Sequence, residues 1–191
     1  ERVRTGAPIA SFTRNAIPPE FDREPVHLSL TSTAVGELGG EVGIGPQARI
    51  AGEPGAQIAL ASATGIRVDG VLSAPAGGID LVLDGDRGET GIQDRIRLGS
   101  AARLTARGAV RLDPPNNSGL QTGEVLDAGK VTIQARQGAL LAEPGASINV
   151  DAVSARLHLD DDGQRPARAV GGKAGEIVLA AAESLVYAGE L

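Results

Sequence analysis

Short runs in which apolar and polar residues alternate recur along most of the chain. A spacing of two places every apolar residue of a run on the same face, as in a β-strand with one buried face. Runs of this kind cover residues 55–60, 65–74, 102–106, 108–112 and 145–150. The alanine-rich residues 179–183 follow such a strand and are too few to form a stable helix. The pattern therefore predicts an all-β chain.

Four further strands begin directly after a Gly-Gly or Ala-Gly pair. The second residues of these pairs are Gly40, Gly78, Gly129 and Gly175, which lie 38, 51 and 46 residues apart. A unit that cannot bury its apolar face alone must stack on copies of itself, so this repeat indicates a solenoid. We interpret each interval as two turns of about 20 residues plus a variable loop, which predicts about seven or eight turns.

Composition and turn residues narrow the fold class. The tetrapeptide Glu-Pro-Gly-Ala occurs at residues 53–56 and 143–146, each time before an alternating strand, and its proline and glycine indicate a corner. Aromatic residues make up only 2% of the chain, so the core consists of aliphatic side chains and alanine, which suits a narrow stack. No helical pattern separates the strands, which excludes a βαβ fold. We predict a right-handed parallel β-helix.

The pattern divides the chain into two parts. Residues 1–38 contain prolines and mixed residues, and we interpret them as a leading linker followed by a first strand. Residues 39–191 are predicted to form the β-helix. Clusters of turn residues predict loops near 84–94, 113–128 and 160–172. Insertions in stacked proteins tend to fall on one face, often the binding face, so these loops are the first places to look for a site.

Charge and missing residue types exclude several classes of function. The formal net charge of -6 argues against nucleic acid or an anionic membrane as a partner. The chain has no cysteine, which excludes disulfides, thiol catalysis and cysteine metal sites. No apolar run approaches 18 residues, so no transmembrane helix is predicted, and no signal peptide precedes the strands. Because the first residue is Glu1 rather than methionine, we interpret the chain as a fragment.

From residue 11 onward the order of these phrases resembles a known family. The phrases are GPQARIAGEPGAQIALASATGIRVDGVLSAPAGGIDLVL, IRLGSAARLTARGAVRL, GEVLDAGKVTIQARQGALLAEPGASINVDAVSARL and VGGKAGEIVLAAAESLVYAGEL. In this order they resemble a shaft segment of the filamentous-haemagglutinin-like exoproteins of Gram-negative bacteria.

The resemblance implies a large adhesin that is secreted or displayed at the cell surface. It also implies that an outer-membrane transporter exports the parent protein by two-partner secretion and that the protein folds outside as a long β-helix. The family's secretion domain does not match any part of this chain. Host glycans, matrix or neighbouring cells are the ligands that the resemblance implies, in adhesion or biofilm formation.

Two histidines and several acidic residues are candidates for chemistry. His27 and His158 occupy alternating strand positions, where we expect them to face outward, and they form no motif. Asp160, Asp161 and Asp162 follow His158, and carboxylates of this kind could bind calcium, although they lack the spacing of a calcium loop. A solvated acidic turn is the simpler interpretation. The same two interpretations apply to the set Asp84, Asp86 and Glu89.

The remaining motifs are weaker. Gly43-Ile44-Gly45 resembles a phosphate-binding turn, but Pro46 follows and no helix begins there. Asn116-Asn117-Ser118 matches the acceptor pattern for N-glycosylation in a predicted loop. Five arginines at alternate strand positions are best explained as a solvated outer face. They are Arg67, Arg95, Arg97, Arg103 and Arg111.

Two functions fit this sequence. Parallel β-helices also include polysaccharide lyases and glycoside hydrolases, which need clustered carboxylates, and Asp80, Asp69 and Arg67 are the residues that would have to come together here. We instead expect a structural and adhesive segment, a stiff spacer whose loops contact ligands, with no catalytic, cofactor or metal residue assigned. The scarcity of aromatic rings, which stack on sugars in many glycan sites, favours a spacer over a glycan-binding module.

Overall fold

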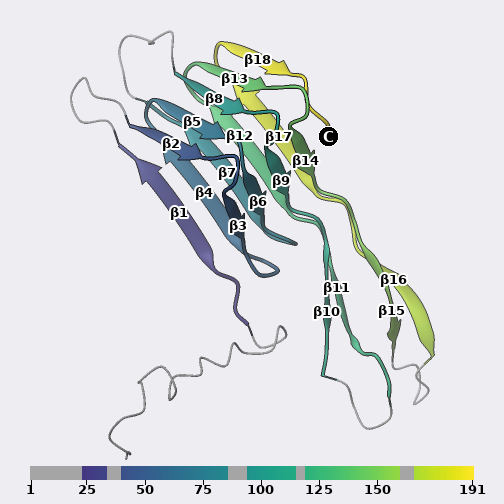
Figure 1. The fold of residues 1–191 in the computed structure, drawn as a ribbon. Helices are drawn as coiled ribbons and strands as arrows, with labels where there is room; N and C mark the ends of the chain where they lie inside the picture. The colour runs from purple at the N-terminus through teal and green to yellow at the C-terminus, as the bar shows by residue number, and fades with distance from the viewer. Residues whose placement is uncertain (1–22, 34–39, 86–93, 115–118, 160–165) are drawn as a thin grey trace, which may run out of the picture.

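The structure is a computed structural model that describes residues 23–33, 40–85, 94–114, 119–159 and 166–191. These residues form 18 β-strands and no helix, which confirms the all-β prediction. Fourteen strands pair in parallel in three sheets, and the other four form two antiparallel hairpins. Figure 1 shows the parallel strands side by side and the hairpins extending away from them. This arrangement is compatible with a β-solenoid.

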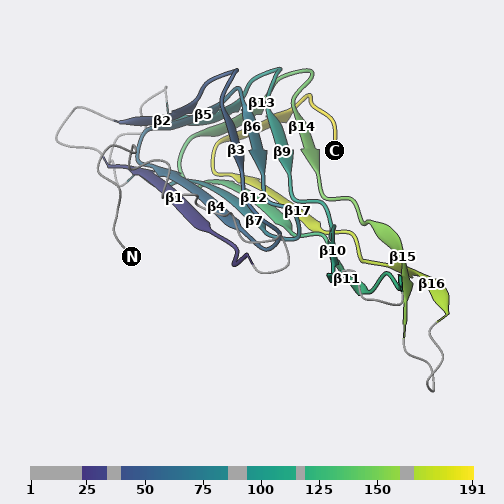
Figure 2. The same ribbon diagram turned by 60° about the horizontal axis from the view of Figure 1, so that its bottom comes forward.

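Three successive strands supply one strand to each sheet, and we call such a set a tier. Sheet 1 contains β1 (His27–Ser32), β4 (Gln57–Ser62), β7 (Gly78–Leu83), β12 (Lys130–Ala135) and β17 (Glu176–Ala181). Sheet 2 contains β2 (Glu41–Ile44), β5 (Gly65–Val68), β8 (Arg95–Leu98), β13 (Ala139–Ala142) and β18 (Ser184–Tyr187). Sheet 3 contains β3 (Arg49–Ala51), β6 (Val71–Ser73), β9 (Arg103–Thr105) and β14 (Ser147–Asn149). The three sheets face one another around a shared interior (Figure 2).

Equivalent residues of successive tiers lie directly beside one another, which stacks the apolar residues in columns. One column of sheet 1 consists of Leu30, Leu60, Leu81, Ile133 and Leu179. Its three middle members are fully buried, and each such side chain contributes roughly 1.5–3 kcal/mol through burial. Columns of the same kind in all three sheets form one continuous aliphatic core. The two-residue spacing of the sequence thus predicted the inward face correctly.

Both Glu-Pro-Gly-Ala segments form the corner that their sequence predicted. In each, the final alanine N–H donates to the glutamate carbonyl oxygen, at 2.9 Å in 53–56 and 3.0 Å in 143–146. The glycines have φ angles of 88° at Gly55 and 90° at Gly145, as a turn with a left-handed third residue requires. The first segment leads into sheet 1 and the second into sheet 3. The shared tetrapeptide therefore marks a shared turn and not the same position in the repeat.

Three of the four glycine pairs stack at one corner of the tiers. Gly77, Gly129 and Gly175 immediately precede β7, β12 and β17, and a β-carbon on Gly175 would lie 1.9 Å from the Gly129 carbonyl oxygen. Backbones this close leave no room for a side chain. Gly40 instead precedes β2 and lies at the corner that opens sheet 2. The four pairs are therefore not one repeat.

The interpretation of two turns in every glycine interval is wrong. Gln57 aligns with Gly78, 21 residues later, which confirms about 20 residues for an uninterrupted tier. Gly78 aligns with Lys130 and Lys130 with Glu176, so each longer interval holds one tier. Hairpins outside the sheets take up most of the remaining residues, and the segment between β7 and β8 takes up others. The described chain accordingly has four complete tiers and a fifth that begins with β17 and β18, fewer than the predicted seven or eight.

Two of the predicted loops contain strands. The first hairpin pairs β10 (Ala109–Leu112) with β11 (Gly123–Leu126), and the second pairs β15 (Ser154–His158) with β16 (Ala167–Gly171). Strands β11 and β16 lie inside the ranges predicted as loops, 113–128 and 160–172. Most of the third predicted loop, 84–94, lies outside the described residues, as does most of the leading segment 1–38, of which β1 joins sheet 1.

Candidate functional site

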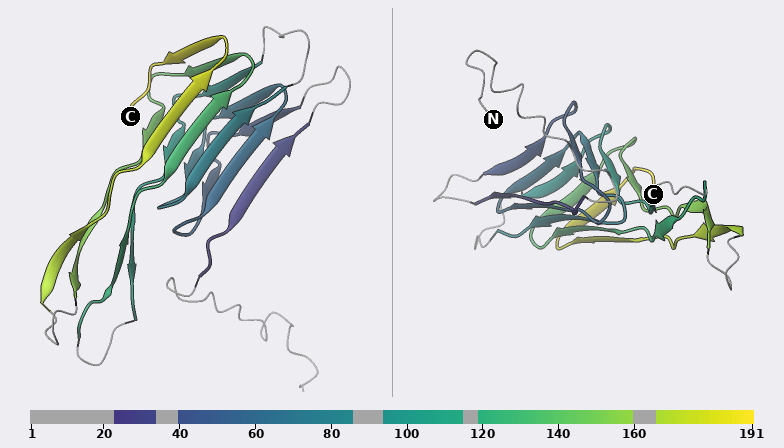
Figure 3. Two further views of the ribbon diagram at one scale, coloured as in Figure 1. Left: turned by 180° about the vertical axis from the view of Figure 1, so that it is seen from behind. Right: turned by 90° about the horizontal axis from the view of Figure 1, so that it is seen from below.

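The two hairpins leave the stack at the same corner. Each follows a strand of sheet 3 and precedes a strand of sheet 1, one after β9 and the other after β14. Figure 3 shows both extending away from the sheets in the same direction. We call the two hairpins with their flanking residues the arm (108–114, 119–127, 151–159 and 166–173). The arm combines two of the three loop regions, 113–128 and 160–172, that the sequence indicated as the first places to look for a site.

Backbone hydrogen bonds join the hairpins near the stack. The Gly108 N–H donates to the Asp151 carbonyl oxygen at 2.9 Å, and the Ala128 N–H donates to the Lys173 carbonyl oxygen at 2.9 Å. The Lys173 N–H donates in turn to the Asp127 carboxylate at 2.7 Å. These bonds connect segments that follow different tiers, so the two hairpins are fixed to each other at the base of the arm.

A second connection lies further out along the arm. The His158 N–H donates to the Gln121 carbonyl oxygen at 2.8 Å, and the Gln121 N–H donates to Nδ1 of the His158 ring at 2.9 Å. His158 is half-buried, whereas the sequence predicted a histidine that faces solvent. Leu157 beside it is only 1% exposed, and it does not belong to the aliphatic core of the stack. His27 is exposed at the start of β1, as predicted.

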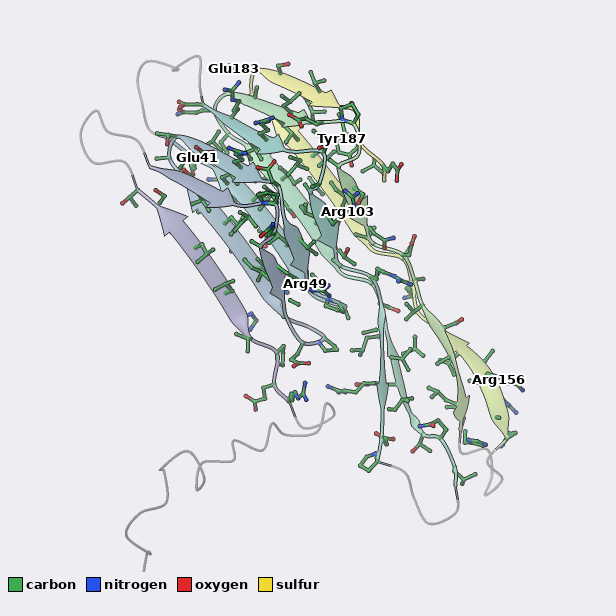
Figure 4. All side chains as sticks on the ribbon, in the orientation of Figure 1. Glu41, Arg49, Arg103, Arg156, Glu183 and Tyr187 are labelled. Atoms are coloured by element: carbon green, nitrogen blue, oxygen red, sulfur yellow. The ribbon has the colours of Figure 1, made fainter. Side chains whose placement is uncertain are left out.

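An open hollow lies on the first hairpin, with a volume of about 410 Å³. Arg111, Asp113, Gly123 and Glu124 line it, and Arg111 forms an ion pair with Glu124 across the two strands. Guanidinium and carboxylate groups of this kind can donate to and accept hydrogen bonds from hydroxyl groups. Arg156 is exposed on the second hairpin (Figure 4). The arm therefore presents polar groups of both charges to a ligand.

A second open hollow lies on sheet 2, with a volume of about 370 Å³. The predicted glycine turn Gly43–Gly45 forms part of it, with Glu41 and the ion pair between Arg67 and Asp69 at 2.6 Å. Gly43 lies in strand β2 and Gly45 begins a turn, so the backbone N–H groups of a phosphate-binding loop are not gathered here.

The outer arginines carry contacts that the sequence does not indicate. Arg97 donates to Glu143 of the next tier at 2.8 Å, and this hydrogen bond, with the Glu143 charge, raises the pKa of the Arg97 guanidinium. Arg103 donates to the Ala102 carbonyl oxygen at 2.9 Å and also bonds Gly145 of the next tier. The partners in the next tier, Glu143 and Gly145, lie more than 40 residues away in sequence, so no local pattern could reveal them.

The residues named for an enzyme do not come together. Arg67 and Asp69 belong to β5 and the corner after it, whereas Asp80 lies in β7 of sheet 1, where its neighbours across the sheet are Ala59 and Thr132. Asp84 pairs with Arg136 at 2.6 Å. Asp86, Glu89, Asn116 and the triplet Asp160–Asp162 lie outside the described residues.

Within the described ranges, no three histidine or acidic side chains are grouped so that they could hold a metal ion. Nor does that part of the chain contain a helix long and apolar enough to cross a membrane. Comparison of the chain with models of protein families, with curated proteins and with solved structures gives no match.

Proposed function

We propose that the stacked sheets form a right-handed parallel β-helix and that the chain is a structural and adhesive segment of a filamentous-haemagglutinin-like exoprotein. Parallel strands joined in one sheet cross over in the right-handed sense in nearly all proteins, which supports the handedness. The order of phrases along the chain supports the family. On this proposal the parent protein is exported through an outer-membrane transporter and is secreted or held at the surface of a Gram-negative bacterium.

The adhesive role in this proposal rests on the arm. Two hairpins leave one corner of a stack whose backbone groups pair from tier to tier, and hydrogen bonds at Gly108, Lys173 and Gln121 fix their positions. A stack of this kind is stiff without disulfides, because every tier is paired to its neighbours and shares their core. The stack thus acts as a spacer, and the arm is the part that contacts host glycans, matrix or a neighbouring cell.

The chemistry of the arm fits a hydroxyl-rich ligand better than an apolar one. Its hollow is lined by Arg111, Asp113 and Glu124. The three aromatic residues of the chain are Phe12, Phe21 and Tyr187, and none belongs to the arm, so stacking on sugar rings does not contribute to binding there. We therefore expect weak individual contacts that gain strength when many copies are displayed together.

Adhesion of beads coated with the chain tests this function. We expect wild-type beads to bind a panel of host glycans, matrix proteins and cell surfaces, and the double substitution Arg111→Ala with Asp113→Ala to lower binding about tenfold. The matched control is Arg67→Ala with Asp69→Ala, which likewise removes one arginine and one aspartate, here from the hollow on sheet 2, and should leave binding unchanged.

Three results would overturn parts of this function. Wild-type beads that bind nothing in the panel would remove the adhesive role, and an equal loss in both double variants would remove the role of the arm. Turnover of an acidic or neutral polysaccharide that Asp80→Ala abolishes would replace adhesion with catalysis.

A further inference from the structure

The described part of the chain buries two polar side chains, and both lie at the corner between sheets 1 and 2. Ser62 is 4% exposed at the end of β4, and Asp94 is 8% exposed directly before β8. The connections that leave β4, β7 and β12 for sheet 2 pass this corner in successive tiers (Figure 1). We call the corner residues of these three connections the polar corner. They are residues 62–64, 84, 85, 94 and 136–138.

In the first of these connections the buried hydroxyl of Ser62 has a full set of partners. Its Oγ donates to the Gly40 carbonyl oxygen at 2.7 Å. It also accepts from the N–H groups of Thr64 and Gly65, each at 3.2 Å. A hydroxyl has one donor and two acceptor positions, so Ser62 is satisfied, as buried polar groups in folded proteins normally are.

The next two tiers place oxygen atoms without partners at the same corner. Oδ2 of Asp94 and Oε1 of Gln137 are buried, and neither forms a hydrogen bond. The two residues come from adjacent tiers, since Asp94 precedes β8 and Gln137 lies between β12 and β13. Burial of a carboxylate or amide oxygen without a partner is unfavourable. Both atoms only accept hydrogen bonds, so they require a donor or a positive charge.

Two glycines bring these side chains to the contact between the third tier (β7 to β9) and the fourth (β12 to β14). A β-carbon on Gly138 would lie 3.2 Å from the β-carbon of Asp94, and the Ala139 N–H donates to the Asp94 carbonyl oxygen at 3.1 Å. A β-carbon on Gly85 would lie 3.6 Å from Oε1 of Gln137. Because Gly85 follows β7, the Gln137 oxygen reaches back to the tier that holds the Asp94 carboxylate.

The arginines beside this pair of oxygens do not neutralise the carboxylate. Arg136, next to Gln137 in sequence, forms its ion pair with Asp84 at 2.6 Å. Arg95, next to Asp94, is exposed on the outer face of sheet 2. A hard cation would satisfy both oxygens at once. Calcium takes about six to eight oxygen ligands, which include carboxylates, side-chain amide oxygens, backbone carbonyls and water.

We propose that Asp94 and Gln137 hold one calcium ion between the third and fourth tiers, with water completing its coordination. The site uses a single acidic side chain and no cluster of acidic residues. One carboxylate among neutral oxygens gives weak binding, with a Kd of about 0.1–1 mM, the range of extracellular calcium modules. The bound ion ties two tiers together at the polar corner. This inference is independent of the adhesive function, because it uses neither the arm nor the hollows.

Thermal unfolding with and without calcium tests the site. The chain is heated in about 10 mM CaCl2, and in NaCl of the same ionic strength with a chelator. An ion that binds only the folded chain raises the unfolding midpoint, and we expect a rise of about 3–5 °C in CaCl2. MgCl2 should give a smaller rise, because magnesium requires a near-ideal octahedral site. Isothermal titration calorimetry with CaCl2 should give one ion per chain.

Three variants separate the possible sources of a calcium effect. Asp94→Asn keeps the shape of the side chain but removes its charge, and it should abolish the rise. Asp84→Asn is the matched control, because it removes an exposed carboxylate from the same corner and should leave the rise unchanged. Gln137→Glu adds a second carboxylate, and calcium affinity should increase about tenfold. Circular dichroism checks that each variant is folded, and Gln137→Glu still decides the matter if Asp94→Asn does not fold.

The calcium site is wrong if CaCl2 stabilises the wild-type chain no more than NaCl does. It is equally wrong if Asp94→Asn keeps the full response, which would place the ion elsewhere, for example at Asp160–Asp162. A Gln137→Glu chain that is less stable and binds calcium no more tightly would show that no ion joins the two oxygens. In that case the Gln137 amide donates directly to Asp94.

Discussion

A β-carbon on Gly129 would lie 1.6 Å from the carbonyl oxygen of Gly77 in the tier before it. Gly129→Ala therefore forces the two backbones apart, and we expect the free energy of unfolding to fall by about 1–3 kcal/mol. Gly43→Ala is the matched control, because nothing lies within 4 Å of a β-carbon there and the position is exposed on the outer face of β2. Urea denaturation measures both, and equal losses would contradict the close approach.

Ile133 and Gln134 are neighbours in β12 that face opposite sides of sheet 1. Ile133 is fully buried, so Ile133→Asp places an unpaired charge in the core, which costs several kcal/mol, a large part of a domain's total stability of about 5–15 kcal/mol. We expect this variant to unfold or aggregate, and Val68→Asp to do the same. Gln134→Asp should remain folded by circular dichroism. A folded Ile133→Asp chain would show that the inward register is wrong.

Ala76 has a φ of 51°, a left-handed conformation that is unfavourable for a residue with a β-carbon. Ala76→Gly relieves this strain but raises the conformational entropy of the unfolded chain. We therefore expect the free energy of unfolding to rise by a net amount of about 0.5 kcal/mol. Ala101 occupies the corner turn between β8 and β9 without such a φ, and Ala101→Gly should lower stability by about 0.5–1 kcal/mol. Thermal unfolding of both variants checks the opposite signs.

Ionisation of Tyr187 at alkaline pH is expected to lower the stability of the last tier. Burial raises the pKa of its phenol above the usual 10.0, and the Glu190 carboxylate raises it further. A group whose pKa is higher in the folded state stabilises the fold fully below its unfolded pKa. That contribution is lost as pH rises through the folded pKa. We therefore expect stability to fall above about pH 10 in the wild-type chain and less in Tyr187→Phe.

Tyrosinate absorbance measures this pKa directly, because Tyr187 is the only tyrosine of the chain. The titration midpoint should be higher in the native protein than in denaturant. Identical midpoints in the two solvents would contradict the prediction.

The bond between His158 and Gln121 is expected to hold the outer arm together. His158→Ala removes the acceptor of the Gln121 N–H, at a cost of about 1 kcal/mol, so the Gln121 amide should exchange with deuterium about fivefold faster. Gln121→Ala keeps the backbone N–H and the histidine acceptor, and exchange should be unaffected. If both variants exchange at the wild-type rate, the two hairpins are not coupled through this bond.

The sequence predicted the inward residues well because burial repeats every second position within one strand. The burial of Leu60 and Val68, for example, could be predicted from the residues of their own strands alone. It did not predict the hairpins, since Ala109–Leu112 alternates like a strand of any tier and only its partner, beyond two prolines, makes it antiparallel.

The candidate site was predicted only in part. The turn clusters at 113–128 and 160–172 located the arm, because turn residues mark the places where the chain leaves a stack. Its connections could not be predicted in the same way. Gln121 and His158 are 37 residues apart, and their pairing depends on two hairpins leaving the same corner in successive tiers.

The number of residues between aligned positions of successive tiers also decides how the stack responds to a pull along its axis. Hydrogen bonds between neighbouring tiers point along that axis, so tension acts on all tier boundaries in series and we expect the tiers to separate one after another. The chain length freed in each event differs, because Gln57 and Gly78 are 21 residues apart whereas Gly78 and Lys130 are 52 apart. The two tiers followed by a hairpin therefore release more than twice the chain length of the tier between Gln57 and Gly78, and a stretched chain lengthens in unequal steps.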